Sequence, residues 1–274
     1  MFQSCKKWAI KKAVRFGQPF FVYLYQTVMI NKLDLVSIIS KYFLNGKNEA
    51  VKWDIKDNKL TIKFKAPDKS MIGVVTCDNF DLEDSSIGIS NTTQLLKLLA
   101  ITNGPLSLEY TKQHKLITKL IVADNQFTLN YALADTMIIP PAGEFAGVDE
   151  YNIVASLDNE SINSIVRAKS SLAETDTVVF KPFTNADGDQ QLEMVFGGNI
   201  EYSNKVSFYI PDIQFHNIPD NFKLNYDSNM IKEVMYCNKD VAHCNMKISL
   251  DGIMNLNFDN GDVKSEYYII AKDY

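Results

Sequence analysis

Apolar residues recur at helical spacing in four short segments, which are separated by longer stretches in which apolar and polar residues alternate. The predicted helices are residues 32–44, the segment that begins at Asn91, the segment 160–172 and the segment 227–237. In the third helix, Ile162, Ile165 and Val166 fall on one side and polar residues on the other. Asn91 and Asp158 precede helices and suit the N-cap position, where a side-chain oxygen accepts a hydrogen bond from a first-turn amide.

The stretches between the helices predict β-strands. After the first helix, Val51, Trp53 and Ile55 alternate with polar residues, and the pair Asp57–Asn58 is typical of a hairpin turn. The predicted strands are 49–56, 59–65, 71–77, 85–90, 105–110, 115–123, 126–133, 151–156, 175–183, 191–198, 205–210, 222–226, 244–250, 253–258 and 263–272. The segment NADGD, residues 185–189, predicts a turn between two of them.

The order of these elements indicates a repeated unit of one helix followed by several strands. The helices begin near residues 32, 91, 158 and 227, which are similar intervals. Between the second and third units, residues 134–151 are rich in proline, glycine and alanine, as linkers are. The pattern therefore predicts an α+β chain of two similar domains, 29–140 and 151–274, with an interdomain linker at 141–150.

Residues 1–28 differ from the rest of the chain. They combine five basic residues with a short apolar run, 20–25, and three interpretations are a signal peptide, a membrane anchor and an upstream extension of the reading frame. The apolar run falls well short of the roughly 20 residues that a spanning helix needs, and no AxA cleavage site follows it. We favour an extension that is not part of the fold, with Met29 as the start, and we expect no membrane association.

Composition and charge restrict the classes of protein. The chain has 274 residues, of which 46% are hydrophobic and 22% charged, as in globular proteins. Its formal net charge is −5, and the portion after residue 28 is more acidic because the first 28 residues contain no acid. An acidic protein does not coat nucleic acid with its whole surface, but an acidic net charge does not exclude a local basic track.

No sequence motif predicts catalysis, a metal or a cofactor. GxxxxGK[ST], GxGxxG, GxSxG and HExxH are all absent from the sequence. The four cysteines have no CxxC spacing, and we expect them to be reduced, since pairing of Cys237 with Cys244 would need a secretory context. His243 adjoins Cys244, but neighbouring residues in a strand point to opposite faces.

Several stretches resemble DNA polymerase sliding clamps, in particular the processivity clamps of T4-like bacteriophages. The stretch MINKLDLVSIISKYF resembles the first helix of such clamps, and VASLDNESINSIVRAKSSLAETDTVVF the opening of their second domain. The closing segment, from FKLNYDSNMIKEVMYCNKD to DVKSEYYIIAKDY, resembles their last helix and strands. The resemblance implies the DNA-clamp fold, in which each domain packs two helices on antiparallel sheets. It also implies a homotrimeric ring whose helices line the hole.

The same resemblance implies a non-catalytic protein that encircles duplex DNA and tethers the replicative polymerase for processive synthesis. The implied partners are double-stranded DNA, bound without regard to sequence, DNA polymerase, an ATP-driven clamp loader and further copies of the chain. The implied location is the cytoplasm of a phage-infected bacterial cell. The alternatives are a β-rich phage structural protein of the virion or tail and, third, an enzyme with an unrecognised site.

A ring of this kind needs basic residues on the helix faces that point toward DNA. Phosphate contacts are independent of sequence and therefore permit sliding. The candidate DNA-facing residues are Arg167, Lys169, Lys41, Lys97 and Lys232. Lys47 and Lys239 lie just past helices and are lesser candidates. The alternative for each lysine is an ordinary solvated position on a polar helix face.

Overall fold

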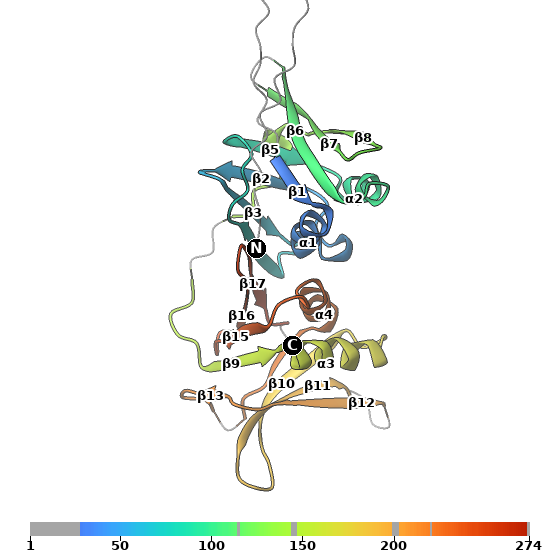
Figure 1. The fold of residues 1–274 in the computed structure, drawn as a ribbon. Coiled ribbons are helices and arrows are strands. Elements are labelled where there is room, and N and C mark those ends of the chain that lie inside the picture. The colour runs from blue at the N-terminus through green and yellow to red at the C-terminus, as the bar shows by residue number, and fades with distance from the viewer. Residues whose placement is uncertain (1–27, 114–115, 144–146, 199–202, 220, 273–274) are drawn as a thin grey trace, which may run out of the picture. The chain divides into compact units, whose positions relative to one another are not determined.

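The computed structural model describes residues 28–113, 116–143, 147–198, 203–219 and 221–272, and Figure 1 shows its helices and strands. The chain divides into two compact units. Unit 1 comprises the chain up to Ile39, Glu49–Ile62 and Cys77–Pro140, and unit 2 comprises Ser40–Asn48, Lys63–Thr76 and the chain from Pro141 onward. The units change at Pro140, where the first domain was predicted to end, and the predicted domain limits stay a prediction.

Unit 1 contains an antiparallel sheet in the order β1-β6-β7-β8 and a second group of strands in which β2 lies between β3 and β5. The strands are β1 (Val28–Asn31), β2 (Val51–Lys56), β3 (Lys59–Lys65, with residues in both units), β5 (Ser85–Ile89), β6 (Pro105–Gln113), β7 (Leu116–Ala123) and β8 (Thr128–Ala132). The helices are α1 (Lys32–Phe43), whose last residues belong to unit 2, and α2 (Thr92–Ala100). A 3₁₀ turn, η1 (Leu44–Gly46), follows α1, and another, η2 (Thr136–Ile138), follows β8.

Local chemistry explains the predicted elements of unit 1. The β2–β3 hairpin turns through Asp57 and Asn58, whose φ angles of 53° and 59° are those that a tight hairpin turn requires. Trp53 of β2 is fully buried, as the alternating pattern predicted. The Asn91 side chain accepts a hydrogen bond of 2.8 Å from the Gln94 amide and caps α2, which confirms its predicted role.

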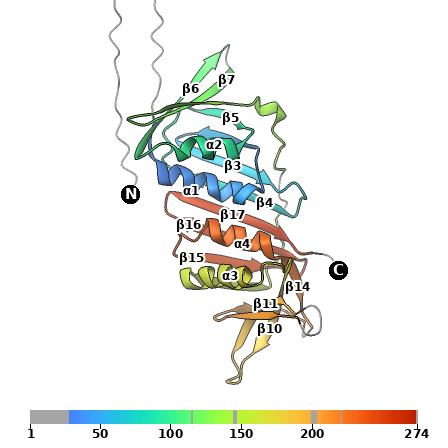
Figure 2. The same ribbon diagram turned by 90° about the vertical axis from the view of Figure 1, so that its right-hand side faces the viewer.

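Unit 2 contains two sheets and two helices. One sheet has the order β12-β11-β10-β14, and the other runs β13-β9-β15-β16-β17-β4. The strands are β4 (Met71–Cys77), β9 (Ile153–Asp158), β10 (Thr177–Thr184), β11 (Gln190–Gly197), β12 (Lys205–Ile210), β13 (Gln214–Phe215), β14 (Leu224–Asp227), β15 (His243–Ile248), β16 (Ile253–Asn260) and β17 (Val263–Ile270). Helices α3 (Asn159–Ser171) and α4 (Ser228–Cys237) lie side by side against the second sheet (Figure 2).

Capping residues and buried faces define α3 and α4. Asp158 caps α3 by accepting a hydrogen bond from the Ser161 amide, and Asp227 caps α4 through the Met230 amide, each at 2.8 Å. Ile162 and Ile165 bury the apolar face of α3, as the helical spacing predicted. The longest described helix has 13 residues, and within the described ranges no helix is long and apolar enough to cross a membrane.

Four short elements were not predicted, among them η1, whose Asn45 and Gly46 lie past the predicted end of the first helix. Strand β1 precedes α1, and its first residue, Val28, is buried and pairs with Leu108 of β6. Val28 therefore belongs to the fold, whereas the rest of the predicted extension, residues 1–27, lies outside the described residues. The two-residue strand β13 and the turn η2, which lies in the predicted linker region 134–151, were also missed.

Candidate nucleic-acid interface

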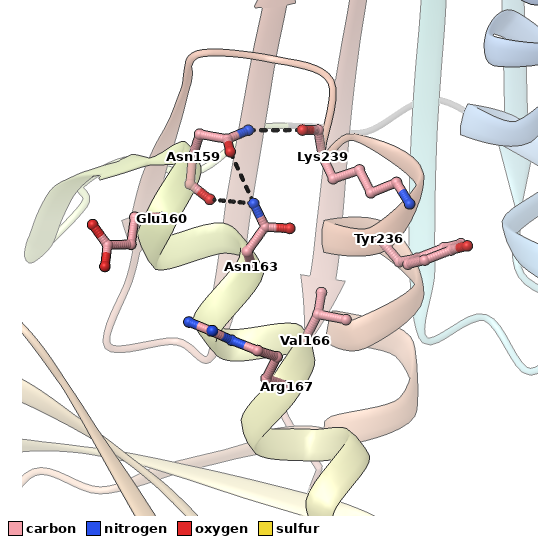
Figure 3. A pocket seen from close by; sticks show the side chains of 7 residues that line it. All are labelled: Asn159, Glu160, Asn163, Val166, Arg167, Tyr236 and Lys239. Atoms are coloured by element: carbon pink, nitrogen blue, oxygen red, sulfur yellow. Dashed lines mark hydrogen bonds between the residues drawn. The ribbon is translucent and has the colours of Figure 1, made fainter.

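A groove of about 740 Å³ lies between α3 and α4 in unit 2. Its lining residues are Asn159, Glu160, Asn163, Val166, Arg167, Tyr236 and Lys239 (Figure 3). Asn163 and Val166 lie between two walls, with Arg167 of α3 on one side and Tyr236 and Lys239 of the α4 side on the other. The groove is therefore formed by two helices, with one basic residue on each wall.

Hydrogen bonds donated by the Asn159 and Asn163 side chains fix the end of this groove at the first turn of α3. The Asn159 Nδ2 atom donates to the carbonyl oxygen of Lys239 at 2.7 Å and to that of Val241 at 3.0 Å. Asn163 Nδ2 in turn donates to the side-chain and main-chain oxygens of Asn159, both at 2.8 Å. These bonds tie the first turn of α3 to the chain that leaves α4.

The two basic side chains of the groove are exposed. Arg167 donates from its guanidinium to Ser164 Oγ at 2.9 Å, and the Lys239 ammonium lies 4.2 Å from the centre of the Tyr236 ring. Among the residues that the structure describes, neither cation forms a salt bridge within 4.0 Å. Glu160 is the acidic member of the lining and lies at the N-terminal end of α3, where a carboxylate favours the helix dipole.

Three of the five predicted DNA-facing residues have side chains that reach solvent. Arg167 on α3 and Lys97 on α2 are exposed. Lys232 on α4 is half-buried, and its ammonium lies 3.9 Å from a carboxylate oxygen of Glu233. Arg167, Lys97 and Lys232 therefore remain candidates for contact with DNA.

The prediction that Lys169 faces DNA is wrong, because its side chain is only 2% exposed. Its ammonium donates to the carbonyl oxygens of Leu172 at 3.2 Å and Ala173 at 2.8 Å, beyond the last turn of α3. Helix C-terminal carbonyls lack intrahelical donors, and a lysine near the end satisfies them. Burial, together with the nearby charge of Lys232, lowers the pKa of Lys169.

The prediction for Lys41 is also wrong, and for the same physical reason. Its side chain is 1% exposed, and its ammonium lies 2.8 Å from Asp240 Oδ1 and donates to the Cys237 carbonyl oxygen at 3.2 Å. Lys41 therefore caps the C-terminal end of α4. In unit 1, Lys32 does the same for α2, donating to the carbonyl oxygens of Ala100 and Thr102.

The described residues offer little nucleophilic or metal chemistry. The described cysteines, Cys77, Cys237 and Cys244, form no disulfide with one another, and Cys5 lies outside the described residues. Burial raises the pKa of Cys237 to about 12 and that of Cys244 still further, so both thiols stay protonated near neutral pH. Cys244 is buried whereas His243 is exposed, and no group of three or more potential metal ligands occurs in the described part of the chain.

The α4 wall of the groove was predicted from the sequence only in part. Lys239 was a lesser candidate, and neither Tyr236 nor Asn159 was singled out. The three-residue spacing of Tyr236 and Lys239 was the available indication, because residues three apart are neighbours on a helical surface. The hydrogen bond from Asn159 to the Lys239 carbonyl joins segments 80 residues apart. Such a long-range contact leaves no local pattern in the sequence.

Comparisons with known proteins identify the fold. No protein-family model matches the chain, and no curated protein sequence matches it. Many solved structures are similar to this chain, and three of them serve as examples. Proliferating cell nuclear antigen (PCNA) from Entamoeba histolytica has 13% identity and a TM-score of 0.71, covering 91% of this chain and 99% of its own. The PCNA2–PCNA3 complex from Sulfolobus tokodaii has 11% identity and a TM-score of 0.68, covering 90% and 99%. A. fulgidus PCNA with the C-terminal region of FEN-1 has 13% identity and a TM-score of 0.68, covering 90% of this chain and 98% of its own.

The predicted clamp fold is thus confirmed, and the chain has the α+β fold of PCNA-type sliding clamps.

Proposed function

We propose that this protein is a sliding clamp that encircles duplex DNA and tethers a replicative DNA polymerase, without catalytic activity of its own. The observation that carries the proposal is the extent of the fold match. It covers 91% of this chain and 99% of the E. histolytica PCNA chain, so both halves of the clamp architecture are represented. Function follows from fold only through a site, and the helices supply the candidate surface.

The groove between α3 and α4 supports a phosphate-binding role. Arg167 and Lys239 present positive charge on opposite walls of the groove. Cations that contact only phosphates hold DNA without reading its sequence, which is what a sliding protein requires. The net charge of −5 disfavours adhesion of DNA elsewhere on the surface, so that closure rather than affinity retains the duplex.

Two edge strands, one in each unit, support assembly into a ring. Strand β8 ends one sheet of unit 1, and strand β12 ends one sheet of unit 2. Each end strand leaves one row of backbone hydrogen-bonding groups available to another chain. Because the two edges are different surfaces, pairing between copies would be head to tail, the arrangement that generates closed rings. The proposed number of subunits in the ring, three, comes from the resemblance to T4-like clamps.

We also propose protein partners and a cellular location for the clamp. The clamp would be placed on DNA by an ATP-driven loader and would act with a polymerase in the cytoplasm of a phage-infected bacterial cell. Met137 and Ile138 in η2 are 89% and 70% exposed, and exposed apolar residues of this size mark contact surfaces for proteins. We propose this segment as one contact point for such partners.

The ring predicts three chains of 31.1 kDa per particle when the protein is measured by light scattering at high concentration. Dilution is expected to shift the particles toward single chains, because assembly follows mass action. A particle of two chains at every concentration would favour a different ring plan. A single chain at the highest concentration would contradict the clamp and leave a structural virion or tail protein as the better account.

A further inference from the structure

Tyr236 and Lys239 form an exposed pair at the end of α4. The Tyr236 side chain is 49% exposed, and the Lys239 ammonium lies 4.2 Å from the centre of its ring. An ammonium at this distance from an aromatic face is attracted by the electrons of the ring. The ring, which lies beside the ammonium in Figure 3, therefore restricts the positions of the ammonium, while Lys239 stays exposed to solvent.

The main chain of Lys239 is held as well. Asn159 donates hydrogen bonds to the carbonyl oxygens of Lys239 and Val241, and Asn163 holds the Asn159 side chain in place. Both the backbone and the side-chain end of Lys239 are thus fixed by neighbours. For a lysine, whose free side chain has high rotamer entropy, this lowers the entropic cost of binding an anion.

Lys239 differs from the two lysines that proved to be buried. The Lys169 ammonium donates to carbonyl oxygens just past α3, and the Lys41 ammonium donates to the Cys237 carbonyl oxygen at the end of α4. The carbonyl of Lys239 itself is taken by Asn159. Because these carbonyls have donors, the Lys239 ammonium is left for an external partner, on the wall opposite Arg167.

We propose that Lys239 contacts DNA phosphates together with Arg167, and that Tyr236 and Asn159 are positioning residues that hold Lys239 ready for this contact. The inference rests on the proposed function, because it takes duplex DNA as the partner. Tyr236 and Asn159 act through Lys239 and need not touch DNA themselves.

The test measures binding of the full chain to a fluorescein-labelled linear DNA duplex by anisotropy over a series of NaCl concentrations. Lys239→Ala should weaken binding and flatten the dependence of log K on log [NaCl], because a phosphate contact is lost. Tyr236→Leu should weaken binding about twofold to fivefold, and Tyr236→Phe, which keeps the ring, should match the wild type. In the Lys239→Ala background, Tyr236→Leu should have no further effect.

Lys56→Ala, which removes an exposed lysine from β2, is the matched control and should leave binding unchanged. Asn159→Ala should weaken binding in the same direction as Tyr236→Leu. If Asn159→Ala also lowers the melting temperature, the Tyr236 variants alone decide, since an exposed ring contributes little to folding.

Equal effects of Tyr236→Leu with and without Lys239 would overturn the positioning role. If the Lys239→Ala variant binds DNA as tightly as the wild type, the proposed Lys239 contact is overturned, while the proposed clamp stands. A wild-type protein that binds no duplex at any salt concentration would overturn the proposed phosphate contact, whereas encirclement is decided by retention on end-blocked DNA and not by affinity.

Discussion

Replacing Lys169 by glutamate is expected to lower the free energy of unfolding by about 3–5 kcal/mol, the usual cost of leaving a buried charge without its partner. The Lys169 ammonium donates to two carbonyl oxygens beyond the end of α3, and its side chain is almost entirely buried. A carboxylate at this place would face those carbonyl oxygens without a donor. Urea unfolding followed by circular dichroism measures the loss.

Arg167→Glu provides the control for this experiment on the same helix. Arg167 is exposed, and exposed charge changes usually alter stability by less than about 0.5 kcal/mol. Lys169→Met should fall between the two, at about 1–3 kcal/mol, because it removes the cap without adding a negative charge. If Lys169→Glu proved as stable as Arg167→Glu, Lys169 would be a solvated residue, as the sequence alone had suggested.

Charge reversal of Arg167 and Lys97 together should weaken binding to linear duplex DNA by at least about tenfold near 0.1 M salt, since each reversal replaces attraction to phosphate with repulsion. Both side chains are exposed on helices, one in each unit, so folding should be preserved. Raised salt should weaken the wild type in the same direction, because screening shortens the reach of the charges. Anisotropy with a labelled duplex measures both effects.

The matched control reverses Lys52 and Lys56, which alternate with the buried residues of β2 and so lie on the other face of that strand. This variant carries the same change of net charge. It is expected to bind duplex DNA much like the wild type. Equal weakening by both double variants would show that net charge alone governs binding and that the helix faces with Arg167 and Lys97 do not contact DNA.

The sequence predicted the helices and most strands because their determinants are local. Asn91 and Asp158 cap helices through amides only three residues away, and Asp57–Asn58 turns a hairpin between adjacent strands. Strand β1 was missed because it depends on pairing with β6, whose partner residues lie far along the chain, as in Val28 with Leu108. Four residues of alternating burial are also too few for a clear pattern.

The candidate site was predicted only in part, because helix periodicity assigns a face and not a partner. Arg167 lies where the pattern placed it. Lys169 donates to carbonyl oxygens just past its own helix, whereas Lys41 of α1 donates to the Cys237 carbonyl oxygen at the end of α4, and helix periodicity records neither contact. The groove itself needs α3 and α4 side by side, so Tyr236 and Lys239 gain a role only in the folded protein.

Encirclement is tested most directly by topology. The protein is mixed with duplex DNA of one sequence in two forms, a linear duplex with free ends and a closed minicircle, and bound protein is measured after a high-salt wash. A ring is expected to thread onto the linear duplex and, once streptavidin blocks biotinylated ends, to remain there through the wash, because salt abolishes phosphate attraction but not linkage. The closed minicircle should retain no protein without a loader. Equal retention by both forms, or complete loss from both, would contradict the claim that this protein encircles DNA.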